Sequence, residues 1–238
     1  MPIRNLLYER QYPVNDSIQI AIPTVGEVLK QEENYYSLVS LITATPADMM
    51  VQLDDMGIDF TEINDYEVFL LIFNQLKSWD TSLIFGSLDL AAFQTVVNTQ
   101  NNMIVLRDTE RNIVIDRGIH NQIAQAVRTI HHLTRNRRNP ANKAAKRFML
   151  QRAREKMRRR KNCTESSQLE ELIVALVNTE QFHYDFSKVP DLTIYQFNES
   201  VQQVIKKIDF DNRMHGIYAG TINAKDLDPK DLNWITHK

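Results

Sequence analysis

One stretch of the chain holds nearly half of its positive charge. Between residues 135 and 161 the sequence RNRRNPANKAAKRFMLQRAREKMRRRK has 13 Lys or Arg and a single acid, a net charge of +12. Since the whole chain carries −2, the remaining residues sum to −14. Runs of like charge repel one another and stay solvated unless a partner of opposite sign is present. The stretch is therefore expected to divide two acidic parts of the chain and to lie outside any core.

Composition allows a sizeable core but excludes several kinds of site. The chain has 238 residues and is 43% hydrophobic, enough for one large domain or two small ones. Cys163 is the sole cysteine, so an internal disulfide and a multi-cysteine metal site are excluded. No apolar run is long enough for a signal peptide or a membrane span. These features favour a cytoplasmic protein without a membrane partner.

The apolar pattern before residue 135 predicts a mainly helical α+β fold. Residues 65–78 (DYEVFLLIFNQLKS) are apolar almost all round, as in a core helix. Asp116 is expected to cap an amphipathic helix that runs to residue 133. Residues 103–106 and 113–115 are expected to form a minor β-hairpin. Further segments are expected to be a strand within 17–23 and helices at 24–30, 34–42 and from Thr45 to near Gly57.

Helix-start signals continue after the hairpin. Asn139 and Pro140 resemble a cap and a first turn for a helix through the basic stretch. Capping boxes are expected at Ser167 with Glu170 and at Thr193 with Gln196, and a last short helix at 229–234. The predicted organisation is an acidic α+β domain (1–134), a long basic helix as linker (135–164) and a small helical domain (165–238), hence two lobes joined by the basic helix.

The basic helix is the main candidate binding element. Three alternatives remain open for it: binding an acidic protein surface, binding nucleic-acid phosphates, and serving as a passive linker. Phe148 is the one aromatic residue in the stretch available for base stacking. The candidate partner-binding residues are Arg135, Arg137, Arg138, Lys143, Lys146, Arg147, Arg152, Arg154, Lys156, Arg158, Arg159, Arg160 and Lys161.

Two other regions are candidates for contacts. Residues 46–67 contain seven acids and no Lys or Arg, so they could receive the basic helix of the same or a neighbouring subunit, or form a solvated face. Near the C-terminus, Tyr195, Phe197 and Trp234 are expected to pack in a core, or alternatively to line a groove for a partner helix.

No residue pattern indicates catalysis. His120, His131 and His132 lack the spacing of a zinc site and are expected to be surface histidines. Asp54, Asp55 and Asp59 lack the spacing and glycine of a calcium loop. Cys163 has cationic neighbours but no identifiable base, so a surface thiol is expected. We therefore expect no enzymatic activity, no metal, no cofactor and no small-molecule substrate.

Two segments resemble phage proteins. Residues 33–73 (ENYYSLVSLITATPADMMVQLDDMGIDFTEINDYEVFLLIF) resemble the N-terminal region of cytoplasmic tail-morphogenesis proteins of phages and prophages of Gram-positive bacteria. Residues 192–220 (LTIYQFNESVQQVIKKIDFDNRMHGIYAG) resemble the aromatic-led helical unit at the end of some phage tail assembly chaperones. Together the two segments cover under a third of the chain.

The resemblance implies a helical, non-catalytic assembly factor in the cytoplasm of the bacterial host. Such a chaperone-like protein would bind the tape-measure protein or other tail proteins, would self-associate, and would be absent from the finished particle. The basic helix departs from that family. It leaves open two alternatives, a phage-encoded nucleic-acid-binding accessory protein and a structural component of the virion.

Overall fold

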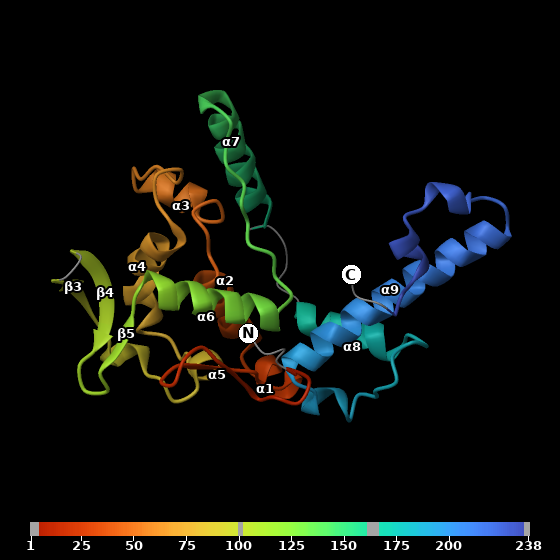
Figure 1. Ribbon diagram of the computed structural model, residues 1–238, viewed down its shortest axis with the longest axis horizontal. Coiled ribbons are helices and arrows are strands. Elements are labelled where there is room, and N and C mark those ends of the chain that lie inside the picture. Colours follow the sequence, from red (N-terminus) through yellow and green to blue (C-terminus); the bar gives the residue numbers. More distant parts are fainter. Residues whose placement is uncertain (1–4, 100–101, 161–166, 236–238) are drawn as a thin grey trace.

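The computed structural model describes residues 5–99, 102–160 and 167–235 (Figure 1). The helices are α1 Val25–Leu29, α2 Glu32–Ile42, α3 Met50–Asp55, α4 Asp65–Leu76, α5 Ser82–Phe85, α6 Arg117–Ile130, α7 Lys143–Arg160, α8 Gln168–Val177 and α9 Ile194–Tyr218. Short 3-10 helices are η1 Leu90–Ala92, η2 Val189–Asp191, η3 Ala224–Asp226 and η4 Pro229–Leu232. The strands are β1 Gln11–Pro13, β2 Gln19–Ala21, β3 Gln94–Asn98, β4 Met103–Asp108 and β5 Ile113–Ile115.

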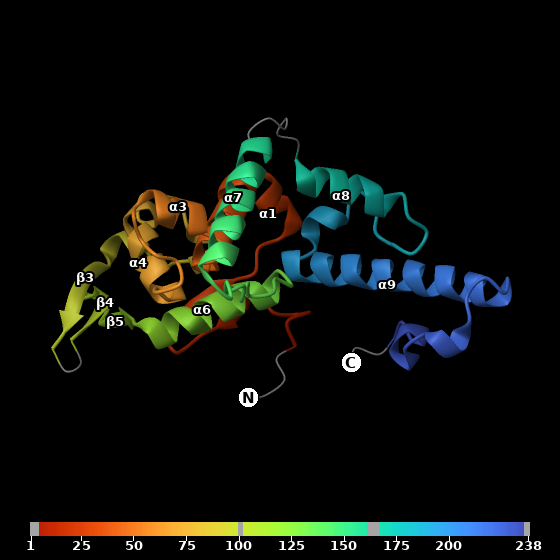
Figure 2. The same cartoon turned by 90° about the horizontal axis from the view of Figure 1, so that it is seen from above.

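The fold is mainly helical with small antiparallel sheets, which confirms the predicted α+β class. Strands β1 and β2 form a two-stranded sheet, and β3, β4 and β5 form a three-stranded sheet in that order. The three-stranded sheet lies at one end of the molecule, whereas α9 extends toward the other end (Figure 1). Helix α7 stands out from the body beside α3 (Figures 1 and 2).

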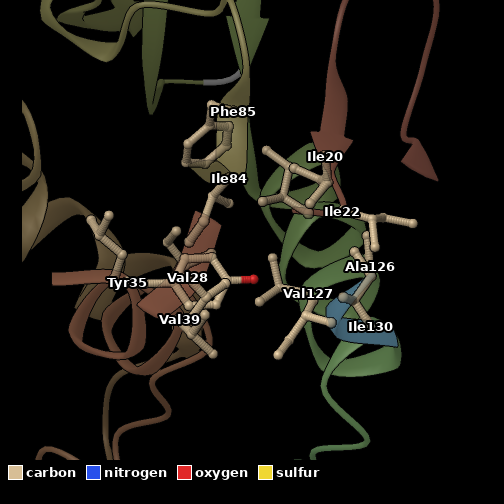
Figure 3. Close-up of a cluster of buried hydrophobic side chains, with 14 of the residues drawn as sticks. Ile20, Ile22, Val28, Tyr35, Val39, Ile84, Phe85, Ala126, Val127 and Ile130 are labelled. Carbon is tan, nitrogen blue, oxygen red and sulfur yellow. The ribbon is translucent and has the colours of Figure 1, made fainter. Parts of the chain in front are cut away.

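Helices α4 and α6 pack in the centre of the protein, as their sequence patterns predict. Phe69 and Phe73 of α4 are each about 1% exposed, and Asn64 caps this helix through a capping box with Glu67. Asp116 caps α6 by accepting a hydrogen bond from the Ile119 amide. The apolar face of α6 packs against β2 and α2 in the core. There Ala126, Val127 and Ile130 belong to one apolar cluster with Ile20, Ile22, Val28, Tyr35, Val39, Ile84 and Phe85 (Figure 3).

The structure contains two strands that the sequence patterns did not predict, and a helix that starts later than predicted. Strands β1 and β3 were not expected; β3 adds a third strand to the predicted hairpin. The segment from Thr45 begins as a turn closed by hydrogen bonds between Thr45 and Asp48, and helix α3 starts only at Met50. Gly57 ends this segment as expected, with a φ of 73° that suits a residue without a Cβ.

The parts of the chain before and after α7 contact each other directly. The Val25 amide donates to the Leu192 carbonyl and the Ile194 amide donates to the Pro23 carbonyl, both at 2.8 Å. One apolar cluster includes residues of α2, α4 and α6 together with Leu169, Ile173 and Phe197. The division into a domain of residues 1–134 and a domain of residues 165–238 stays a prediction; in the folded chain, one apolar cluster contains residues of both parts.

The predicted capping boxes of the C-terminal part form in different ways. The Thr193 box with Gln196 is complete at the start of α9. Ser167 accepts from the Glu170 amide, but the reciprocal partner is Glu32 of α2, which accepts hydrogen bonds from the Ser167 hydroxyl and the Leu169 amide. The first turn of α8 is therefore held by an acid that lies more than 130 residues earlier in the chain.

Candidate functional site

The basic helix α7 begins three residues later than the sequence signals predict. Asn142 caps it, because its Oδ1 accepts a hydrogen bond from the Ala145 amide at 2.8 Å. Asn139 and Pro140 belong to the irregular segment that precedes it. From Lys143 onward the residues are mainly Ala, Arg, Lys, Gln and Met, which all favour the helix. The helix therefore forms from local propensity, and the tertiary structure decides where it lies.

One face of α7 packs on the acidic segment of the same chain. Met149, Leu150 and Ala153 are partly buried against a small apolar cluster formed by α3 and its surroundings, which includes Met50 and Phe60. This cluster is separate from the large core. We call the side of α7 that makes these contacts its inner face.

Ion pairs flank the apolar contact on both sides. Lys146 pairs with Asp59, and Arg154 reaches both Asp54 at 2.7 Å and Asp55 at 2.6 Å. We call Asp54, Asp55 and Asp59 together the acidic face. The hydrogen bonds from Lys146 and Thr61 lower the pKa of Asp59 to about 2, so this carboxylate stays charged at neutral pH. Of the alternatives for the acidic segment, the structure shows the one in which it receives the basic helix of its own chain.

A buried ion cluster anchors the chain just before α7. Arg135 donates two hydrogen bonds to the carboxylate of Asp65, at 2.8 and 2.9 Å. Arg128 lies 3.7 Å from the same carboxylate and donates to the Thr43 carbonyl at 2.7 Å. The side chains of Asp65 and Arg128 are 5% and 7% exposed, whereas that of Arg135 is 47% exposed. Asp65 also lies in the first turn of α4, where the helix dipole favours an anion.

The solvent-exposed side chains of α7 are mostly basic. We call the following exposed residues together the outer face: Arg147, Phe148, Arg152, Lys156, Arg158 and Arg159. Two of them, Arg147 and Arg158, also border a shallow hollow that Arg154 and Asp54 line. Phe148 is 59% exposed, and the Arg152 guanidinium lies 5.5 Å from the centre of its ring. Within the described residues no ion pair joins Arg147, Lys156 or Arg158 to an acid. The outer face thus combines positive charge with one exposed aromatic ring.

The predicted basic residues therefore separate into distinct groups. Arg135, Lys146 and Arg154 bind acids of the same chain, while Arg137, Arg138 and Lys143 are exposed near the start of the helix. The side chain of Arg160 and the whole of Lys161 lie outside the described residues, as does Cys163.

The aromatic candidates near the C-terminus lie in different environments. Phe197 is completely buried in the large core, so in this conformation it is a packing residue rather than part of a groove. Tyr195 is partly buried, donates to Glu199 at 2.9 Å and stacks on His132. Trp234 folds back on α9, where Lys207 lies 5.4 Å from its ring centre and Gln203 donates to its carbonyl.

His120 is buried and His131 is partly buried, whereas both were expected to be surface histidines. His120 is 1% exposed, stacks on Phe69 at 4.4 Å, and neither ring nitrogen has a hydrogen-bond partner. Burial lowers the pKa of His120 to about 4. Burial also lowers the pKa of His131 to about 4; its Nε2 lies 3.0 Å from the Tyr35 hydroxyl oxygen. The spacing of His120 to Ile123 and Val127 places it on the buried side of α6, a signal that sequence analysis overlooked.

The partners of Arg128 in the buried ion cluster leave no signal in the sequence. The helical pattern of α6 does not show that Arg128 is buried, because a charged side chain normally faces solvent. Its burial depends on Thr43 and Asp65, which the fold brings next to it. Among the described residues no group of three or more His, Cys, Asp or Glu is placed to hold a metal ion. None of the described helices combines the length and apolar character needed to cross a membrane.

A hollow lies between α8 and the N-terminal helices α1 and α2. This cavity has a volume of about 440 Å³, and its wall is mostly apolar. Phe186 and Val174 in its wall are 56% and 47% exposed, and the carboxylates of Glu32 and Glu170 lie at its polar part.

The comparisons with known proteins concern the C-terminal third of the chain. Residues 159–238 match the family model of the YomV second domain. YomV is a protein of a Bacillus prophage region. The matched residues include α8, α9 and the segment that folds back on α9. No curated protein and no solved structure matches the chain.

Proposed function

We propose that this chain is a non-catalytic, chaperone-like assembly factor of a phage or prophage tail. On this proposal the outer face of α7 binds an acidic segment of the tape-measure protein or another tail protein. The prophage context is supported by the match of residues 159–238 to the YomV second domain. The tail context is supported by the sequence resemblance of residues 33–73 and 192–220.

The observation that carries the proposal is that the inner face of α7 is paired with acids of its own chain, whereas its outer face is exposed to solvent. Its inner face is engaged with the acidic face of the same chain, which fixes the helix on the body. Its outer face presents Lys156 and Arg158 to solvent, without an acid of the described residues to pair with them. Charged surfaces of this kind accelerate association with partners of opposite sign and select against partners of like sign. An acidic helix or loop therefore fits this surface.

Co-expression with the tape-measure protein of the same genome tests the proposal. The wild-type chain should co-purify with it, and the variant Arg152→Gln/Lys156→Gln/Arg158→Gln should lose most of this capture with an unchanged melting temperature. A matched control removes three exposed charges elsewhere, Lys30→Gln/Arg117→Gln/Lys230→Gln, and should retain capture. Equal capture by both variants, or none by the wild type, would contradict the proposal.

Nucleic-acid binding is the second candidate, and one contact favours it. Phe148 is exposed beside the Arg152 guanidinium, and single-strand binding proteins combine such rings and cations to stack bases. Anisotropy titrations of a labelled single-stranded oligonucleotide should then show a steep fall of log affinity with log salt. Nanomolar binding at physiological salt that is lost on Phe148→Ala would favour this candidate over the assembly factor.

A further inference from the structure

The contact between α7 and the acidic face has the properties of an exchangeable contact. Its ion pairs are between side chains that are 26% to 57% exposed. Exposed pairs contribute little individually and are screened by salt. The apolar part is limited to Met149, Leu150 and Ala153, which pack on a cluster separate from the main core. Helix α7 can therefore leave the acidic face while the main core stays intact.

The chain on the N-terminal side of α7 is suited to such a movement. Arg135 and Asn136 are tied to the body through Asp65 and Asp48. From residue 137 to residue 142 the chain has no helix or strand and is mostly exposed. The anchor thus ends just before the irregular segment, and α7 follows directly after it.

We propose that the acidic face also accepts α7 of a second copy of this chain, so that copies are linked by exchange of this helix. The exchanged helix makes the same ion pairs and apolar contacts as the helix of the same chain, which is why such exchange has a small free-energy cost. Charge complementarity selects the occupant, because α7 has nine Lys or Arg against one Glu and the receiving surface has three Asp. High local concentration in an assembly favours the exchanged form. The inference concerns the inner face and does not depend on the partner of the outer face.

The Lys146–Asp59 pair allows a direct test on the wild-type chain. A carbodiimide couples an amine to a carboxylate that it contacts, so it should join Lys146 to Asp59. In an equal mixture of ¹⁴N- and ¹⁵N-labelled protein, cross-linked peptides from one chain have a single isotope, whereas half of the cross-linked peptides from two chains have both. We expect the mixed fraction to rise with protein concentration toward the statistical limit of one half. Single-isotope peptides at every concentration would overturn the inference.

A charge-swap experiment tests the same contact by complementation. Two variants each place like charges where Arg154 meets the acidic face of the same chain: Asp54→Lys/Asp55→Lys and Arg154→Glu. Between the two variants the charges are again opposite, because the new lysines of one can pair with the new glutamate of the other. The two should stay monomeric separately and associate when mixed, as measured by multi-angle light scattering. Arg152→Glu, which changes the outer face by the same charge, should not associate with the first variant. Failure of the pair to associate, although circular dichroism shows both folded, would also overturn the inference.

The two proposals fail in different ways. Helix exchange is measured with the purified chain alone, so loss of tape-measure capture leaves its outcome unaffected. Conversely, the outer-face variants retain Lys146, Arg154 and the acidic face, so their effect on capture is independent of exchange.

Discussion

Replacing Asp65 by Asn should be among the most destabilising single changes near the basic helix. Its carboxylate is buried and compensates the guanidinium of Arg128, which is itself buried. Removing one member of a buried ion pair costs about 3–5 kcal/mol, because the remaining charge stays desolvated. Asparagine still accepts one hydrogen bond, and Arg128 keeps its bond to the Thr43 carbonyl. We therefore expect a loss near the lower limit, about 3 kcal/mol.

The cluster also predicts an order of effects. Arg135→Gln should cost less, about 1 kcal/mol, since the Arg135 side chain is half exposed and water replaces part of its interaction. Asp65→Asn/Arg135→Gln should cost less than the sum of the single changes, because both remove the same contact. Asp59→Asn is the control within the same acidic segment, and its effect should be smaller than that of Asp65→Asn because its pair with Lys146 is partly exposed.

Urea unfolding followed by circular dichroism at pH 7 measures these differences. The reasoning fails if Asp65→Asn lies within about 1 kcal/mol of the wild type, since a buried charge without its partner is then not costly here. It also fails if Arg135→Gln is the more destabilising change, because the exposed arginine rather than the buried one would then depend on Asp65.

Three further predictions concern the core, pH and salt. Phe69→Ala should reduce the free energy of unfolding by about 3–5 kcal/mol, and a near-neutral result in urea would mean that this face of α4 is not core. His120 and His131 each have a pKa of about 4 in the folded chain and about 6.5 in the unfolded chain. Between these two values the unfolded chain binds more protons than the folded chain, so the free energy of unfolding should decrease as the pH falls from about 6.5 to about 4. His120→Leu should flatten this pH profile of the melting temperature, and an unchanged profile would remove His120 as a cause. Light scattering should detect oligomers at low salt that dissociate at least partly near 1 M salt, because the screening length there is about 3 Å. A monomer at every salt concentration would contradict charge-driven association.

Local signals in the sequence were sufficient for the fold class and for several element boundaries. Asp116 and Thr193 start α6 and α9 as expected, because a cap acts on amides two or three residues away. The almost entirely apolar sequence of α4 likewise places it in the core, whatever surrounds it. The missed strand β3 has few apolar residues facing the core, so its pairing with β4 rests on backbone hydrogen bonds that leave little pattern in the sequence.

The excess charge of residues 135–161 is a property of the sequence alone, and so is the expectation that this stretch stays outside the core. Which acids it meets depended on the tertiary structure. Arg154 binds Asp54 and Asp55 about 100 residues away, and Arg135 binds Asp65 at a separation of 70. Ion pairs act over a few ångströms, so they form only where α3, α4 and α6 bring these groups together. The same holds for the burial of His120 and Arg128, because a helix presents its face by periodicity but only its neighbours exclude the water.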